Sequence, residues 1–102
     1  MNSRYILSPR AAEDLVEIWT YIKDNAGPEI ADRVSSGIRE KFVFLAANPF
    51  AGHRRESLTE KNVRFFSVYS YLIVYRPETK PLQIASVLHG NRNVQNLLRE
   101  RL

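Results

Sequence analysis

Three apolar runs in the second half of the chain predict a small antiparallel sheet. Val63–Val68, Tyr69–Tyr75 and Leu82–Leu88 are rich in Val, Ile, Tyr and Phe, the residues that favour a pleated, half-buried strand. Pro77 cannot donate to a sheet ladder, so the second strand is expected to end near Arg76. Connections this short return the chain antiparallel, because a parallel neighbour needs a long crossover.

Apolar residues in the first half recur at helical spacing instead. One stripe at i, i+3, i+4 and i+7 consists of Leu15, Ile18, Trp19 and Ile22, and Glu13, Asp14, Glu17 and Thr20 fall largely off it. Ser8-Pro9 is a strong helix start, and Asn25–Gly27 favours a helix end. A second stripe runs through Ile30, Ala31, Val34, Ile38, Phe42 and Leu45. It predicts a helix from Gly27-Pro28 to Asn48-Pro49.

The short link between these segments predicts an antiparallel helical hairpin. Trp19 sits inside its stripe and is expected to be a core or interhelix residue. Gly37 either permits close approach of the first helix or is a tolerated weak point. The run Phe42–Leu45 points around most of a helix, so Val43 or Phe44 is left for solvent or for a partner.

Two shorter elements complete the prediction. Arg4–Leu7 is a candidate first strand, and helical spacing within Asn91–Leu102 predicts a short C-terminal helix. The expected fold is therefore α+β, with a two-helix hairpin packed on a small, mainly antiparallel β-sheet, in the order β-α-α-β-β-β and then the C-terminal helix. Its 102 residues, 44% of them hydrophobic, are expected to form a single domain over residues 1–102.

Composition removes several classes of function. The chain has no cysteine, and His53 and His89 alone do not make a zinc site, so no metal is expected. It contains no Gly-rich phosphate loop, no GxSxG and no HExxH, so no cofactor is expected either. Acidic residues interrupt the first 25 positions, and no apolar run reaches membrane-spanning length. We expect a soluble, cytoplasmic protein without a membrane partner.

The positive charge is concentrated in the predicted sheet half. The whole chain carries a formal net charge of +4, but residues 1–50 hold six basic and seven acidic side chains, whereas residues 51–102 hold nine and four. This asymmetry favours an acidic or polyanionic partner, although a basic face kept for solubility is the simpler explanation of charge alone.

Candidate chemistry is limited to a few residues of this half. Arg64 stands inside an apolar strand, where it either contacts an acidic partner through its planar guanidinium or covers apolar surface with its stem. His89 can shuttle a proton near neutral pH, but without a clear acid partner it is better interpreted as a hydrogen-bonded residue at a strand end. Arg92 follows three residues later, so both could face one groove, and Arg76 is a third cation. Tyr69, Tyr71 and Tyr75 are expected to alternate on one face of a strand, a pattern more typical of core than of base stacking.

The residues also resemble a known family across nearly the whole chain. The matching pieces are Ser8–Leu15, Leu45 with Asn48-Pro49, Val63-Arg64, Tyr71–Arg76 and Val87–Arg92. In this order and spacing the chain resembles the ParE/RelE superfamily of bacterial toxins from type II toxin–antitoxin modules, and is closest to the ParE branch. Asn93 stands where ParE-like proteins commonly have Asp, which puts any role of that carboxylate in doubt.

The resemblance implies two helices packed across a small sheet, together with a cognate antitoxin whose flexible segment wraps the toxin. ParE-type members poison DNA gyrase, which predicts a binding-type inhibitor rather than an enzyme. RelE-type members cleave mRNA on the ribosome, and this alternative would use His89, Arg64 and Arg92, assisted by Tyr75 or Lys61. A third alternative is a non-toxic member that only binds its partner.

The residues expected to bind a partner are Arg64, Arg76, His89, Arg92, Trp19, Phe42 and Phe44. They combine the cations of the sheet half with apolar groups of the helices. An acidic, amphipathic antitoxin segment that folds on binding would fit this combination. The sequence therefore predicts one cationic side of the sheet that binds an acidic macromolecule.

Overall fold

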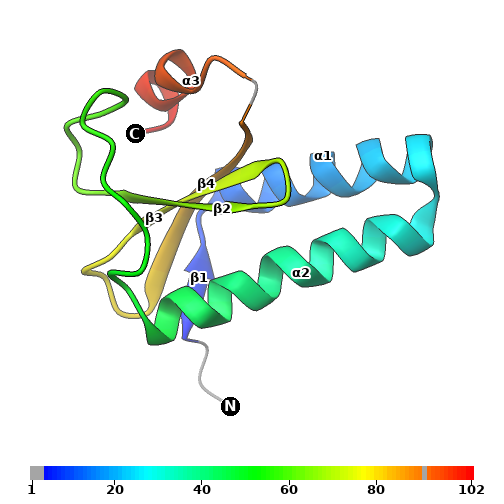
Figure 1. Ribbon diagram of the computed structural model, residues 1–102, viewed down its shortest axis with the longest axis horizontal. Coiled ribbons are helices and arrows are strands. Elements are labelled where there is room, and N and C mark those ends of the chain that lie inside the picture. Colours follow the sequence, from blue (N-terminus) through cyan, green and yellow to red (C-terminus); the bar gives the residue numbers. More distant parts are fainter. Residues whose placement is uncertain (1–3, 91) are drawn as a thin grey trace.

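The computed structural model describes residues 4–90 and 92–102 and has the predicted order of elements. They are β1 (Tyr5–Leu7), α1 (Pro9–Ala26), α2 (Pro28–Ala47), β2 (Arg64–Val68), β3 (Tyr71–Arg76), β4 (Leu82–His89) and α3 (Val94–Arg101). The α+β class is confirmed (Figure 1). Asn91, the predicted beginning of the C-terminal helix, lies outside the described residues. In the described part of the chain, no helix is long and apolar enough to cross a membrane.

The four described strands form one sheet in the order β1-β4-β3-β2. β2, β3 and β4 make the predicted antiparallel meander, with Arg64 opposite Tyr75 and Tyr71 opposite His89. β1 joins as the parallel neighbour of β4, because the helical hairpin supplies the long crossover that parallel pairing requires. The mainly antiparallel sheet is confirmed, and β1 and β2 are its two edge strands. On the β2 edge, His53 forms an isolated antiparallel bridge to Phe65.

Local chemistry accounts for the hairpin. The Ser8 hydroxyl accepts a hydrogen bond from the Ala11 backbone N–H at 3.0 Å and donates one to the Ala85 carbonyl at 2.8 Å, so it caps α1 and ties the cap to β4. Gly27 separates the two helices with φ of +96°, a conformation that side-chain-bearing residues rarely adopt. Pro28 then opens α2, as predicted.

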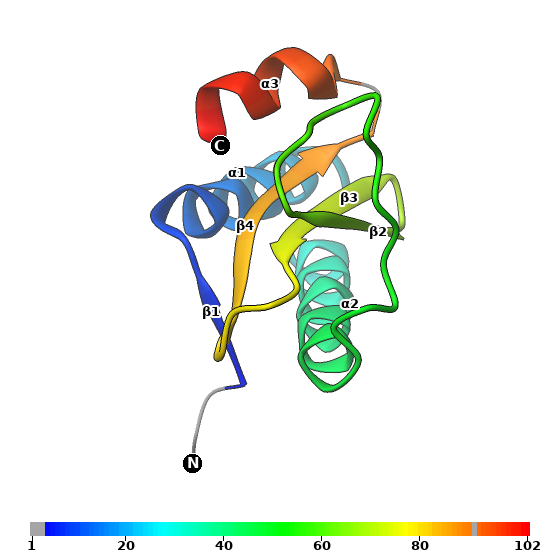
Figure 2. The same ribbon diagram turned by 90° about the vertical axis from the view of Figure 1, so that its left-hand side faces the viewer.

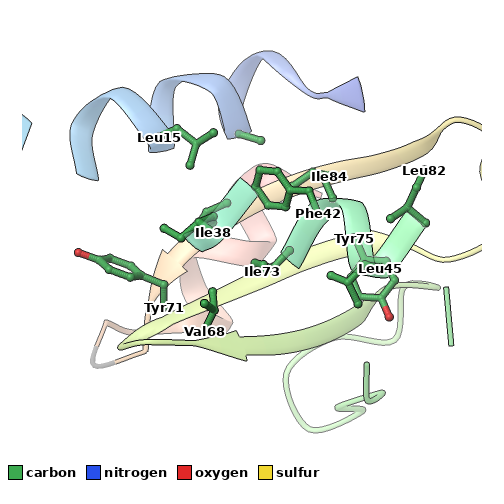
Figure 3. Close-up of a cluster of buried hydrophobic side chains, with 12 residues drawn as sticks. Leu15, Ile38, Phe42, Leu45, Val68, Tyr71, Ile73, Tyr75, Leu82 and Ile84 are labelled. Carbon is green, nitrogen blue, oxygen red and sulfur yellow. The ribbon is translucent and has the colours of Figure 1, made fainter. Parts of the chain in front are cut away.

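One face of the sheet packs on the hairpin. Figure 3 shows the centre of this core, where Phe42 and Ile38 of α2 meet Leu15 of α1 and Ile73 of β3. Tyr71 and Tyr75 belong to the same cluster, so the interpretation of these two tyrosines as core residues is confirmed. Tyr69 instead lies in the turn between β2 and β3 and is exposed.

The opposite face of the sheet is covered as well. Val94 and Leu98 of α3 pack on it together with Leu58 of the 48–62 connection. Figure 2 shows α3 at the top of the view, across the strands from α2, and the connection passing in front of the strands. The sheet therefore has a packed layer on each side, so neither of its faces is left bare.

Asp14 closes the edge of β4 beyond the end of β1. Its carboxylate accepts hydrogen bonds from the Val87 backbone N–H and the Ser86 hydroxyl, both at 2.9 Å. The side chain is buried, which corrects the expectation that Asp14 lies off the buried stripe. It lies three residues after the buried Ala11 and next to Leu15, so extending the stripe back to Ala11 would have included it.

Candidate functional site

The three arginines expected to form one cationic surface lie apart. Arg64, at the start of β2, is opposite Tyr75 and faces the hairpin side, whereas Arg76 follows Tyr75 and faces the other side. Arg92 comes after β4, at the far end of the sheet. The prediction of a single cationic side is therefore wrong, although no carboxylate lies within 4 Å of any of the three in the described part of the chain.

Arg64 holds the segment that follows α2. Its Nη1 donates to the Gly52 carbonyl at 2.8 Å, and its guanidinium carbon lies 5.1 Å from the centre of the Phe50 ring. Tyr75 holds the same segment from the core: its hydroxyl donates to the Pro49 carbonyl at 2.7 Å and accepts from the Gly52 N–H at 2.9 Å. Arg64 and Tyr75 therefore both hold the backbone of this segment in place. Figure 3 shows the Tyr75 hydroxyl at the margin of the core.

Aromatic and basic side chains gather where α2 meets the β2 edge of the sheet. The Phe44 ring of α2 lies 5.7 Å from the Phe66 ring of β2, and the Lys41 ammonium lies 5.9 Å from the centre of the Phe44 ring. Arg64 over Phe50 continues the group at one end, and Tyr69 continues it at the other. We call the six residues Lys41, Phe44, Phe50, Arg64, Phe66 and Tyr69 the edge seam. Phe44, Phe50 and Tyr69 are 42%, 62% and 60% exposed.

A second group surrounds a cavity of about 330 Å³ between α1 and the end of the sheet. His89 and Arg92 both line it, as their spacing predicted for a common groove. The His89 ring meets the Tyr71 ring edge to face, with centroids 5.4 Å apart, and burial raises the pKa of Tyr71, with a further contribution from Tyr21. Figure 3 shows the Tyr71 phenol pointing away from the other labelled side chains.

Several residues that line this cavity were not predicted from the sequence. Glu17, Ile18 and Tyr21 of α1 line it together with Val87 and Asp14. The sequence did indicate part of this arrangement, because Glu17 and Tyr21 are four residues apart and so lie on the same side of a helix. What the sequence could not supply is the approach of that side to the end of β4.

Comparison with known proteins shows which family the chain belongs to. A family model described as "ParE toxin of type II toxin-antitoxin system, parDE" matches residues 5–94. The chain belongs to the ParE toxin family. The Toxin ParE1 of Mycobacterium tuberculosis is 30% identical over 99 residues, covering 96% of this chain and all of the relative. The Toxin ParE1 of Caulobacter vibrioides is 31% identical over 91 residues, covering 89% and 93%.

The fold agrees with this assignment to the ParE family. A solved structure described as "Chromosomal ParDE TA system from P. aeruginosa" matches with a TM-score of 0.72 and 26% identity, covering 85% of this chain and 98% of that chain. The predicted resemblance to the ParE branch is confirmed. Asn93, the departure from the usual ParE pattern, caps α3: its side-chain oxygen accepts from the Asn96 N–H at 3.3 Å. Asn and Asp are both good caps, so this exchange preserves the helix start.

The remaining predicted residues of this ParE-family chain have mixed outcomes. Phe42 is fully buried, so its predicted contact with a partner is wrong, whereas Phe44 and Val43 are exposed. Trp19 is confirmed as an interhelix residue, because its indole N–H donates to the Asp32 carboxylate at 2.8 Å. Arg76 donates to the Gln83 side chain at 2.8 Å.

Of the groups proposed for ribonuclease chemistry, His89 and Arg92 line one cavity, whereas Arg64, Tyr75 and Lys61 do not line it. Tyr75 pairs with Ile84 at one end of β4 and His89 stands at the other end. Lys61 lines a separate cavity beside Arg99 of α3. Among the described residues, no three His, Asp or Glu side chains are grouped so that they could hold a metal ion.

Proposed function

We propose that this ParE-family chain inhibits DNA gyrase by binding to it and is neutralised by a cognate antitoxin. The observation that carries the proposal is the family match over residues 5–94, in a family of toxins from type II toxin–antitoxin systems. The structural neighbour described as a ParDE system supports the antitoxin partner. Inhibition by binding agrees with the separate positions of Arg64, His89 and Lys61.

A second candidate is ribosome-dependent cleavage of mRNA. One observation favours it: His89 and Arg92 line the same cavity, beside the Tyr71 phenol. Imidazole and guanidinium would serve as proton shuttle and phosphate ligand in such a reaction. Arg64 already donates to the Gly52 carbonyl and does not line this cavity. The ribonuclease hypothesis is therefore left with fewer catalytic groups than the sequence suggested.

Expression under tight control separates the candidates. The chain is induced from a repressed promoter, and incorporation of labelled thymidine and methionine is followed alongside the integrity of mRNA. The proposal predicts that DNA synthesis stops first and that the purified chain reduces supercoiling by gyrase in vitro. Rapid mRNA decay with intact supercoiling would reject gyrase as the target, and growth unaffected by a folded chain would instead indicate the non-toxic, partner-binding member.

The histidine provides an independent check of the enzymatic candidate. His89→Gln retains a planar polar group but cannot act as a proton shuttle. If the chain cleaves RNA and this variant cleaves it equally well, His89 has no role as the shuttle. Growth arrest that is undiminished in His89→Gln, with intact mRNA, agrees with inhibition by binding.

A further inference from the structure

The edge seam follows one side of α2. Gly37, Lys41 and Phe44 succeed one another at intervals of four and three residues, which places them on one side of the helix. The Tyr69 phenol lies against Gly37, where a Cβ would collide with it, and Phe66 of β2 lies against Phe44. The seam therefore runs continuously from the β2–β3 turn, along the helix, to the segment after α2.

The seam exposes more apolar surface than isolated hydrophobic residues do. Three of its aromatic side chains are each more than two-fifths exposed, and they lie within one strip of surface. Contiguous exposed apolar patches on a monomer commonly mark an interaction site. Aromatic residues and arginine are also enriched in protein interfaces.

The same strip carries positive charge without internal compensation. Lys41 and Arg64 lie over the faces of Phe44 and Phe50, and in the described part of the chain no carboxylate lies within 4 Å of either cation. Arg54 and Arg55, both exposed, follow in the adjoining connection. A partner that covers the rings would therefore bring acidic groups to the cations.

The backbone at this edge offers hydrogen bonds. The Phe65 N–H and carbonyl pair with His53 at 2.8 and 2.9 Å, so the amide groups of Phe65 point outward from the sheet. Groups two residues apart on a strand point the same way, so those of Ser67 also point outward. Ser67 is exposed. An open strand edge of this kind can accept an extended segment of another chain.

We propose that the edge seam binds an acidic, extended segment of the antitoxin, which pairs with the backbone of Ser67 and places carboxylates against Lys41 and Arg64. Apolar side chains of the segment cover Phe44 and Phe50. The inference rests on the proposed function, because it takes the partner to be an antitoxin. It adds the surface, the conformation and the charge of the segment that is bound.

Two single substitutions test the side chains of the seam. Lys41→Glu and Phe44→Ser are exposed changes on α2, and Val43→Ser is the matched control, since Val43 is 49% exposed and, as the residue next to Phe44 on the helix, points to a different side of α2. The probe is the cognate antitoxin of the proposed function, titrated calorimetrically against the full-length chain. Each seam variant is expected to weaken binding at least about tenfold, as loss of an interface contact does. The control is expected to bind within about twofold of the unsubstituted chain.

Salt and amide exchange test the charge and the backbone pairing. Added salt should weaken the unsubstituted complex more than the Lys41→Glu complex, because salt screens attraction between exposed charges. The Ser67 amide should exchange quickly in the free chain and at least about tenfold more slowly in the complex, since strand pairing protects it. Ser67→Pro removes this donor at an edge position where proline is tolerated, and it should weaken binding too.

The outcomes distinguish the inference from the proposed function. An antitoxin that neutralises the toxin, binds both seam variants as tightly as the control and leaves the Ser67 amide unprotected would overturn the seam while the function stands. An antitoxin that fails to bind the unsubstituted chain would overturn both. Circular dichroism of every variant shows whether it is folded, and for a variant that is not folded, exchange at Ser67 in the unsubstituted complex decides.

Discussion

The Arg101 guanidinium lies 3.2 Å from the Asp14 carboxylate, although the two residues are 87 positions apart. Both side chains are almost fully buried, and Arg101 also donates to the Ser86 hydroxyl at 2.7 Å. Arg10 approaches the same carboxylate at 3.5 Å. This contact joins the last helix to the first helix and to β4, so it fixes α3 against the face of the sheet that α3 covers.

Arg101→Leu is expected to destabilise the protein by about 3 kcal/mol, because removing one partner of a buried ion pair leaves a buried charge with less compensation. Urea unfolding followed by circular dichroism measures the change. Arg99→Leu is the control on the exposed side of α3 and should change stability by less than about 0.5 kcal/mol. If Arg101→Leu is as harmless as the control, the contact does not hold α3.

Tyr75→Phe is expected to cost about 1–3 kcal/mol, since it leaves the Gly52 N–H and the Pro49 carbonyl without their partner while the ring remains. The segment after α2 should loosen, which faster exchange of the Gly52 amide would report. Tyr69→Phe removes an exposed hydroxyl and serves as the control. Equal stability of the two variants would show that the hydrogen bonds of Tyr75 contribute nothing.

The elements of this fold could be predicted because they depend on local patterns. Ser8-Pro9 and Gly27-Pro28 mark helix boundaries through backbone chemistry alone, and the strands show in their composition. The short links force the hairpin and the meander. These features need no knowledge of contacts distant in sequence.

The candidate site depends on contacts that sequence spacing does not contain. The register of β2 against β3 decides which face Arg64 takes, and the direction of β4 sends Arg92 to the opposite end of the sheet. Arg101, the ion-pair partner of Asp14, lies in the last helix, so no local sequence pattern could predict this contact. The cavity at His89 forms only when α1 crosses the sheet.

Stability is expected to fall as the pH rises above 10. Burial raises the pKa of Tyr75, an effect that the Gly52 contact and Arg64 oppose only in part, and burial also raises the pKa of Tyr71. In the unfolded chain both phenols ionise near their ordinary pKa of 10.0. Above pH 10 the unfolded chain therefore loses phenol protons that the folded chain still holds, which favours unfolding. The stabilisation is complete below pH 10 and is lost as the pH rises through the folded pKa.

Urea unfolding across this alkaline range measures the slope of stability against pH. The double variant Tyr71→Phe/Tyr75→Phe lacks both phenols, so its stability should fall less steeply than that of the unsubstituted chain. A slope that is the same in the double variant and in the unsubstituted chain would contradict the assignment to these buried tyrosines.

Gly27 and Gly37 are expected to respond to alanine in opposite directions. At Gly27 there is open space for a Cβ, but φ of +96° is strained for alanine, so Gly27→Ala should destabilise by about 1 kcal/mol. At Gly37 the backbone is helical and alanine favours it by about 0.5–1 kcal/mol, while the Cβ displaces only the end of the exposed Tyr69 side chain. Thermal unfolding measures the stability of both variants. Repeating Gly37→Ala in a Tyr69→Ala background separates the helix preference of alanine from the cost of displacing the Tyr69 side chain. If Gly37→Ala lowers stability in both backgrounds, something other than the Tyr69 phenol requires glycine there.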